Sequence, residues 1–159
     1  MLISALAFAA VFAFPHVTGK NLNGTNFQLP ADFAAPINLV FVAFKREQQS
    51  DVDSWKPFVT DLKSKYPQLG VYEVPTLSSG YTLFRGFIDG GMRSGIPDPN
   101  VRATTITLYL DKRAFDRELG VDSEAAITVL LVRPSGEIPW RTTGRFDPEH
   151  PPQLDEYLR

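Results

Sequence analysis

The stretch that most constrains the fold is the run INLVFVAF at residues 37–44. It is apolar almost without interruption and rich in β-branched and aromatic residues, which is typical of a strand buried on both faces. Such a strand lies inside a sheet whose two faces are both covered by helices. Because a chain of 159 residues has room for one core of this kind, we expect a single α/β domain.

Strand and helix patterns alternate along the rest of the chain. This order predicts a central mixed β-sheet flanked by helices on both faces, with an N-terminal β-extension. Pro57 is expected to kink its helix or to begin the regular part, Ser50 to cap it, and Gly90 and Gly91 to break the next helix. The expected strands are a hairpin near 17–29 and runs at 37–44, 70–77, 103–111, 127–132 and 137–144, and the expected helices are 50–66, 81–96, 112–119 and a closing helix in 153–159 that follows Pro148.

The chain begins with a segment of different composition. Residues 2–14 are almost wholly apolar, but about 20 residues are needed to span a bilayer as a helix. The length fits the core of a signal peptide, and Ala-Val-Phe-Ala at 10–13 resembles a cleavage site. We therefore expect a signal or anchor segment at 1–14, a single folded domain at 15–159, and a protein that is exported or membrane-associated. The alternatives are a buried N-terminal element and a location in the cytoplasm or an organellar matrix.

Charge and composition exclude several functions. The net charge of −2 and the pI near 5.7 argue against nucleic-acid binding, which requires a basic excess. The absence of cysteine removes disulfides, thiol catalysis and thiolate metal sites. His16 and His150 lie far apart in the chain, and neither belongs to a metal-binding spacing. We expect neither a metal nor a cofactor.

The order of elements resembles the thioredoxin fold in its longer form, found in exported reductases and peroxiredoxin-like proteins. FPHVTGKNLNGTNFQLP resembles the opening of that family, INLVFVAF the strand before its redox motif, and LYLDKRAFDRELGVDSEAAITVLLVRPSGEI its closing half. The resemblance covers roughly residues 15–145. It implies a fold more than a function, because this fold serves many roles.

The resemblance also shows what this chain lacks. Aligned with the family, either Glu47–Ser50 or Gln49–Val52 occupies the place of the two-cysteine motif, and neither window contains sulfur. Ile127 stands where the family has a cis-proline, and its peptide bond is expected to be trans because a non-proline cis bond costs about 2.5–4 kcal/mol. A serine hydroxyl does not carry out thiol–disulfide exchange. Dithiol oxidoreductase and peroxidase activities are therefore excluded, although a non-redox activity is not.

A narrower resemblance concerns the assembly factors of the ATP synthase membrane sector, which are also thioredoxin-like. The stretches FKREQQSDVDSWKPF, YEVPTL, GGMRSGI and GEIPWRTTG are similar to that family, and Ile138, Trp140 and Gly144 match its final hairpin. The resemblance implies chaperone-like binding of a membrane subunit without catalysis.

Three candidate binding regions follow, each with a structural alternative. The turn after the central strand lies where ligands and client peptides dock in this fold, or it is a solvated loop. The arginine-rich region can hold a small anion or fix a crossover through ion pairs. The last strand offers an aromatic and an arginine for a partner, or the aromatic packs in the core. These residues are Arg46, Glu47, Gln48, Gln49 and Ser50 on the turn, Arg85, Asp89, Arg93 and Arg102 in the arginine-rich region, and Trp140 and Arg141 on the strand.

The function expected from the sequence is that of a redox-inactive, thioredoxin-like binding, assembly or chaperone-like factor. Its expected partner is another protein, such as an integral membrane subunit. The first alternative is an enzyme or sensor that binds a small anionic ligand through the arginine-rich region. The second is a purely structural remnant of a reductase.

Overall fold

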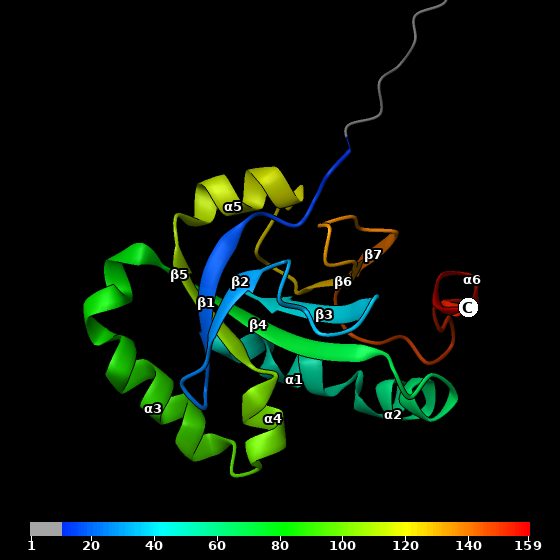
Figure 1. Cartoon of the computed structure of the whole chain (residues 1–159), viewed down its shortest axis with the longest axis horizontal. Coiled ribbons are helices and arrows are strands. Elements are labelled where there is room, and N and C mark those ends of the chain that lie inside the picture. Colours follow the sequence, from blue (N-terminus) through cyan, green and yellow to red (C-terminus); the bar gives the residue numbers. More distant parts are fainter. Residues whose placement is uncertain (1–10) are drawn as a thin grey trace, which may run out of the picture.

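Strand β3 (Asn38–Ala43) lies inside a seven-stranded sheet in the computed structural model, which describes residues 11–159, and all but its last residue are buried (Figure 1). It pairs in parallel with β4 (Gly70–Ser78) and antiparallel with β6 (Thr128–Val132), so the expected mixed sheet is confirmed. The strand order is β2-β1-β5-β4-β3-β6-β7. The other strands are β1 (Val17–Asn21), β2 (Asn26–Leu29), β5 (Ile106–Leu110) and β7 (Trp140–Thr143).

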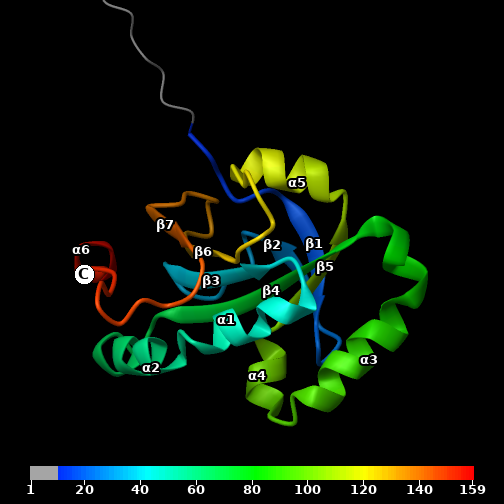
Figure 2. The same ribbon diagram turned by 180° about the vertical axis from the view of Figure 1, so that it is seen from behind.

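Alternate side chains of β3 feed two separate cores. Leu39 and Phe41 join the cluster on one face of the sheet, and Val40 and Val42 join the cluster on the other. This is the period-two alternation of a strand buried on both sides. Helices α1 (Gln49–Asp53), α2 (Lys56–Lys65) and the terminal α6 (Asp155–Leu158) lie over the first face, and α5 (Lys112–Leu119) lies over the second (Figure 2).

The helical stretch predicted at 50–66 is two helices. Pro57 stands in the first turn of α2, where its missing N–H leaves no hydrogen bond unmade, so it begins the regular part as expected. The cap predicted at Ser50 is wrong. Ser50 lies inside α1, and its hydroxyl donates to the carbonyl oxygen of Glu47 at 3.5 Å instead of accepting from a backbone N–H.

The region between β4 and β5 differs most from its prediction. A 3₁₀ helix, η2 (Ser79–Phe84), leads into α3 (Arg85–Gly95), which runs through Gly90 and Gly91 without the predicted break. The predicted strand at 103–111 is shorter, because its first residue belongs to an unforeseen helix, α4 (Pro99–Ala103). Asp98 caps α4 by accepting from the N–H of Asn100, a signal present in the sequence.

The closing half of the domain follows the prediction closely. Helix α5 ends at Gly120, whose φ of 76° is the left-handed conformation that glycine adopts readily at this position. Strands β6 and β7 form the expected antiparallel hairpin. The chain then forms a turn near Pro148, and the closing helix is only the single turn of α6.

The described chain enters the fold immediately before β1. Phe14 is buried and packs edge-on against Phe33 and Phe115, and its N–H donates to the carbonyl oxygen of Gly136. The folded domain thus includes Phe14, and most of the apolar segment predicted as a signal or anchor lies outside the described residues. Within residues 11–159 no helix has the length and apolar character needed to cross a bilayer.

Candidate functional site

The turn that follows β3 is organised around one buried amide side chain. Residues Arg46–Gln48 form a single 3₁₀ turn, η1, in which Gln48 points inward. The Gln48 side-chain oxygen accepts hydrogen bonds from the N–H groups of Phe44, at 2.8 Å, and Lys45, at 3.3 Å. It therefore satisfies two backbone donors that the strand leaves free where it ends.

The other end of the same amide reaches a distant loop. The Gln48 nitrogen donates to the carbonyl oxygen of Glu124 at 2.7 Å. The Lys112 ammonium donates to the Glu124 carboxylate at 2.9 Å and to the Phe44 carbonyl oxygen at 3.5 Å. Polar contacts thus join the turn after β3 to the loop before β6, the positions that the family resemblance assigns to the two-cysteine motif and to the cis-proline.

Two carboxyl groups meet beside this junction. Burial raises the pKa of Asp116 to about 6, and its hydrogen bond with Glu124 adds to the effect. One oxygen of Asp116 is buried without a hydrogen-bond partner among the described residues. A proton on Asp116 therefore favours its contact with Glu124, since two neighbouring carboxylates repel one another.

The residue in the family's cis-proline position is part of the core. Ile127 is fully buried in the core cluster that contains Leu39 and Phe41. Among residues 11–159 the only cis peptide bond is Leu29–Pro30, so the bond before Ile127 is trans, as predicted. An inward apolar side chain here contributes to the core and leaves no proline ring at the surface.

The remaining predicted residues of the turn are exposed. They lie at the start of the helical layer, where Gln49 donates to an Asp53 carboxylate oxygen at 3.2 Å. Only Gln48 of this group is built into the interior. The exposed members are Arg46, Glu47, Gln49 and Ser50.

In the arginine-rich region, the Asp89 carboxylate anchors α3 to β5. It accepts from Tyr109 at 2.7 Å and from Thr107 at 3.1 Å, and it pairs with Arg85 at 3.4 Å. Arg85 also donates to the Thr107 carbonyl oxygen and lies 4.7 Å from the centre of the Tyr109 ring. Burial and the hydrogen bond to Asp89 raise the pKa of Tyr109. Arg85 and Asp89 thus fix the crossover internally.

The other two arginines of that region do not join this network. Arg93 is exposed on α3. Arg102 lies on α4, where its carbonyl oxygen accepts from the N–H of Leu22 and its buried Nε has no hydrogen-bond partner among the described residues. The four charged residues predicted in this region therefore do not form one site. Arg85 and Asp89 pair inside the fold, Arg93 is exposed, and Arg102 contacts Leu22 through its backbone.

The predicted residues of the last strand also make internal contacts. Trp140 is half-buried and packs against the cluster around Trp55. Arg141 donates to the carbonyl oxygens of Leu119 at 2.6 Å and Gly120 at 3.2 Å, which satisfies acceptors at the end of α5. Burial lowers the pKa of Arg141.

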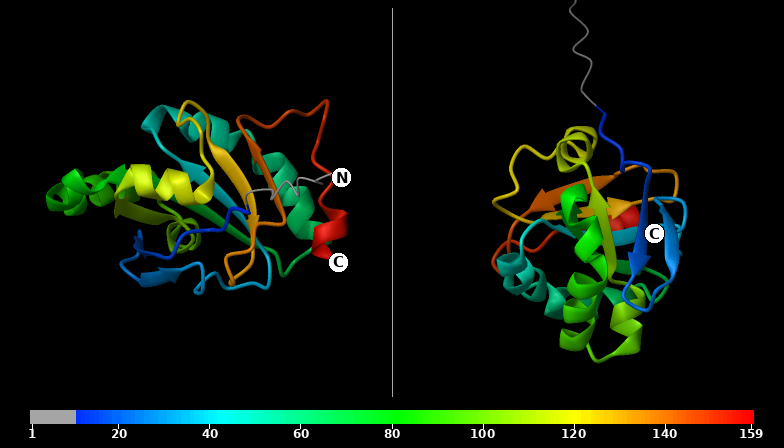
Figure 3. Two further views of the ribbon diagram at one scale, coloured as in Figure 1. Left: turned by 90° about the horizontal axis from the view of Figure 1, so that it is seen from above. Right: turned by 90° about the vertical axis from the view of Figure 1, so that its left-hand side faces the viewer.

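The surface that sequence analysis missed is formed by η2 and the start of α3. Leu83 and Phe87 are 94% and 86% exposed, and Tyr81 and Phe84 are 55% and 60% exposed. We call these four side chains the apolar surface. Figure 3 shows α3 projecting at the end of the molecule opposite α6. The signal in the sequence was a run of large apolar residues in a stretch too rich in glycine to form a core helix.

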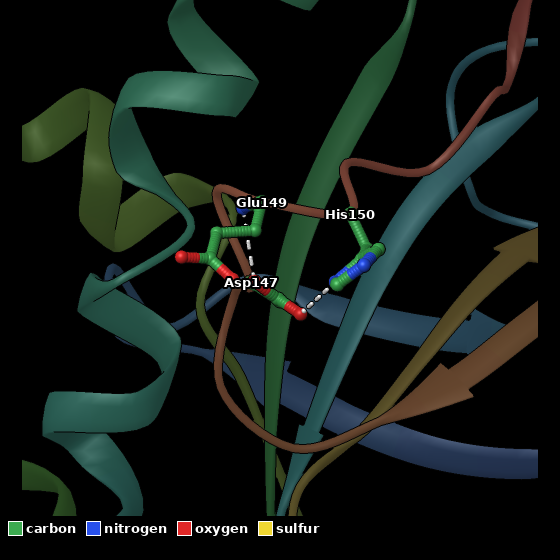
Figure 4. A group of neighbouring side chains, drawn as sticks. All are labelled: Asp147, Glu149 and His150. Atoms are coloured by element: carbon green, nitrogen blue, oxygen red, sulfur yellow. Dashed lines mark hydrogen bonds and ion pairs between the residues drawn. The ribbon is translucent and has the colours of Figure 1, made fainter.

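A cluster of polar side chains lies near the C-terminus. Asp147 and His150 form a 2.8 Å contact, and the N–H of Glu149 donates to the other Asp147 oxygen at 2.9 Å (Figure 4). These three side chains are the only group of metal-ligand type found among residues 11–159. All three are exposed, and the contacts are those of a local turn.

Comparisons with known proteins define the fold. No protein-family model and no curated protein matches the chain. A proposed electron transfer protein from Aquifex aeolicus VF5 superposes with a TM-score of 0.62 at 10% identity, over 87% of this chain and 90% of that one. BsSco, a member of the Sco family of cytochrome c oxidase assembly proteins, gives 0.54 at 12% identity over 84% of each chain.

A proposed thioredoxin from Neisseria meningitidis gives a TM-score of 0.52 at 19% identity, over 88% of this chain and 85% of that one. The chain therefore has an α/β thioredoxin-like fold, with a mixed sheet of seven strands flanked by helices. It contains no cysteine, so thiol redox activity is absent.

Proposed function

We propose that this protein is a thioredoxin-fold binding factor that has exchanged redox chemistry for recognition of another protein. The observation that carries the proposal is the apolar surface. Its four side chains lie between residues 81 and 87 and are all more than half exposed. Taking 150–250 Å² for a large side chain, they present roughly 500 Å² of apolar area. Patches of this size on a soluble domain are often interaction sites.

The place where the fold usually binds its substrates supports the same proposal. Gln48, Lys112 and Glu124 connect the turn after β3 to the loop before β6. A client peptide would have to break these contacts to reach the backbone there. The apolar surface, which follows the carboxyl end of β4, needs no such rearrangement, so recognition takes place on η2 and α3.

The finer proposal is that the partner is an integral membrane subunit and that the protein assists its folding or assembly, near a membrane or outside the cell. The resemblance to ATP synthase assembly factors supports this, and an assembly role is also named for BsSco. The alternative of an anionic ligand is weaker, because Arg85 and Asp89 neutralise each other inside the fold.

A capture experiment tests the proposal. Tagged protein is incubated with detergent extracts of the source membranes, and the bound polypeptides are quantified by mass spectrometry. The Leu83→Asp/Phe87→Asp variant places two charges on the apolar surface. Thr60→Asp/Ser64→Asp is the matched control, since both residues are exposed on α2 and also four apart.

The proposal predicts one membrane polypeptide recovered by the wild type and by the α2 control, with at least a tenfold loss for the surface variant. Equal recovery by all three proteins would mean that this surface is not the binding site. No enrichment over bare resin would remove the proposed function altogether.

A further inference from the structure

Helix α3 presents two faces of different composition. Its inward face carries the Arg85–Asp89 pair together with Ile88 and Met92, all partly buried. Its outward face carries Phe87, small residues and Arg93, all exposed. Gly86, Gly90 and Ser94 follow one another at intervals of four and so form a row along that face, beside Phe87.

No tertiary contact within the described chain requires glycine at Gly86 or Gly90. A Cβ atom added at either position would meet no atom within 4 Å outside the neighbouring backbone of its own helix. At Gly19, in contrast, a Cβ would lie 2.6 Å from the Leu108 side chain. Glycine weakens a helix relative to alanine, and its small size leaves the backbone of α3 open to close approach from outside.

The composition of the face favours a helix as the partner. Small residues four apart on a helix allow a second helix to approach the backbone closely. Leu83 and Phe87 add large exposed apolar side chains at the start of the same region. A lipid surface would gain from the apolar side chains but would have no use for the row of small residues.

The charges on η2 and α3 further define the chemistry of the partner helix. Between Ser79 and Pro97 the charged residues are Arg85, Asp89 and Arg93, and the first two pair with each other against β5. The outward face is therefore uncharged except for Arg93 near the end of α3. A complementary helix has an uncharged face with an acidic group at one end, beside this guanidinium.

The size of the face argues against a second copy of the chain as the occupant. A stable dimer of the standard kind buries about 800 Å² on each partner. The apolar surface offers roughly 500 Å², so a homodimer built on it would be weak. Transient binding of a client, in contrast, requires no larger area.

Resting on the proposed function, we propose that the partner presents an uncharged apolar α-helix, which packs along the Gly86–Gly90–Ser94 row with Leu83 and Phe87 at its side. The client is thus recognised as a formed helix and not as an extended strand. This distinguishes the site from the sheet-edge docking typical of extended peptides.

The test uses a defined probe. A fluorescent 20-residue peptide has leucine, alanine and glycine on one helical face, with small residues four apart, glutamine on the other face and glutamate at its ends. A second peptide differs from the first only in two central prolines that break the helix. Binding is measured by fluorescence polarisation. Gly90→Leu places a large side chain in the row of small residues, and Ser64→Leu adds an exposed leucine to α2 as the matched control.

We expect the wild type and Ser64→Leu to bind the helical peptide at least tenfold more tightly than the broken one. Gly90→Leu should lose at least tenfold in affinity while its melting temperature stays the same or rises, because leucine favours the helix. A rise in melting temperature with unchanged affinity would overturn the helix inference. If Leu83→Asp/Phe87→Asp still abolished capture of the membrane polypeptide in that case, the proposed function would stand without the helix inference.

Three further outcomes would also overturn the inference. One is equal binding of the two peptides. Another is binding of the wild type to phosphatidylcholine–phosphatidylglycerol vesicles without binding to the helical peptide. The third is a dimer in sedimentation equilibrium that dissociates in Gly90→Leu, which would make a second copy the occupant.

Discussion

The side-chain amide of Gln48 joins the turn after β3 to the carbonyl oxygen of Glu124, over a distance of 2.7 Å and a separation of 76 residues. The same amide accepts from the N–H groups of Phe44 and Lys45. One buried glutamine thus joins the two segments that the family resemblance matches to the two-cysteine motif and to the cis-proline. The arrangement stabilises the fold and leaves the turn without a reactive group.

Replacing Gln48 with leucine should destabilise the protein by about 2–4 kcal/mol. The buried N–H of Phe44 and the partly buried carbonyl oxygen of Glu124 would both lose their partners. A fully buried unsatisfied group costs about 1–3 kcal/mol, and a partly buried one costs less. Urea unfolding measures the change. Gln49→Leu, at the neighbouring exposed position, is the control and should change stability by less than about 0.5 kcal/mol. Equal effects at the two positions would contradict the structural role of Gln48.

The carboxyl group of Asp116 should make stability depend on pH. Burial and Glu124 raise its pKa in the folded protein to about 6, from an ordinary value of 3.8. Between these values the folded state binds more protons than the unfolded state, so the stabilising contribution is fully present below about pH 4 and is lost as the pH rises through 6. Since Asp116 is only partly buried, the loss is about 1–2 kcal/mol after solvent screening.

The Asp116→Asn variant removes this titration. Its unfolding free energy relative to wild type should rise between pH 4 and pH 6.5 and level off above that range. Glu118→Gln on the exposed side of α5 provides the control. A flat difference curve for Asp116→Asn, or the same curve for both variants, would show that Asp116 keeps an ordinary pKa.

Asp89→Asn should loosen α3 without unfolding the domain. The substitution keeps the shape of the side chain but removes its negative charge. That charge pairs with Arg85, and it also strengthens the hydrogen bonds that Asp89 accepts from Tyr109 and Thr107. A loss of about 1–2 kcal/mol corresponds to a roughly 5- to 30-fold faster amide hydrogen exchange in α3. Asp61→Asn, exposed on α2, should leave that exchange unchanged. If amide hydrogen exchange in α3 kept the wild-type rate in both variants, the anchoring role of Asp89 would be ruled out.

The guanidinium of Arg141 should stabilise the end of α5. Arg141→Ala removes two hydrogen bonds to the carbonyl oxygens of Leu119 and Gly120 and should lower the free energy of unfolding by about 1–2 kcal/mol. Thermal and urea denaturation measure the effect. Arg113→Ala, at an exposed position of α5, should change the free energy of unfolding little. A similar loss of stability in this control would mean that the effect comes from net charge and not from the two hydrogen bonds.

The pattern of the sequence predicted the elements whose side chains feed the core. INLVFVAF became β3 because its alternate residues have apolar neighbours on both faces, and Gly120 ended α5 because the backbone there needs a positive φ. The predicted break at Gly90 failed for a tertiary reason. Asp89, fixed by Tyr109 and Thr107 on β5, holds the neighbouring turns of α3 in place despite the weak local propensity.

The candidate site was harder to predict for the same reason. The role of Gln48 depends on Glu124, which local periodicity does not bring near, and the role of Arg141 depends on the end of α5. Phe84 is spaced at helical intervals from Ile88 and Met92, which are partly buried. Because η2 winds as a 3₁₀ helix, Phe84 is instead exposed.

The central claim, recognition of a protein through the apolar surface, is tested most directly by site-specific photocrosslinking. A benzophenone amino acid is placed at Phe87 in one protein and at Ser64 in another, and each is irradiated in extracts of the source membranes. The account predicts one discrete crosslinked polypeptide from position 87 and none from position 64. Crosslinks of equal yield from both positions, or none from position 87, would contradict it.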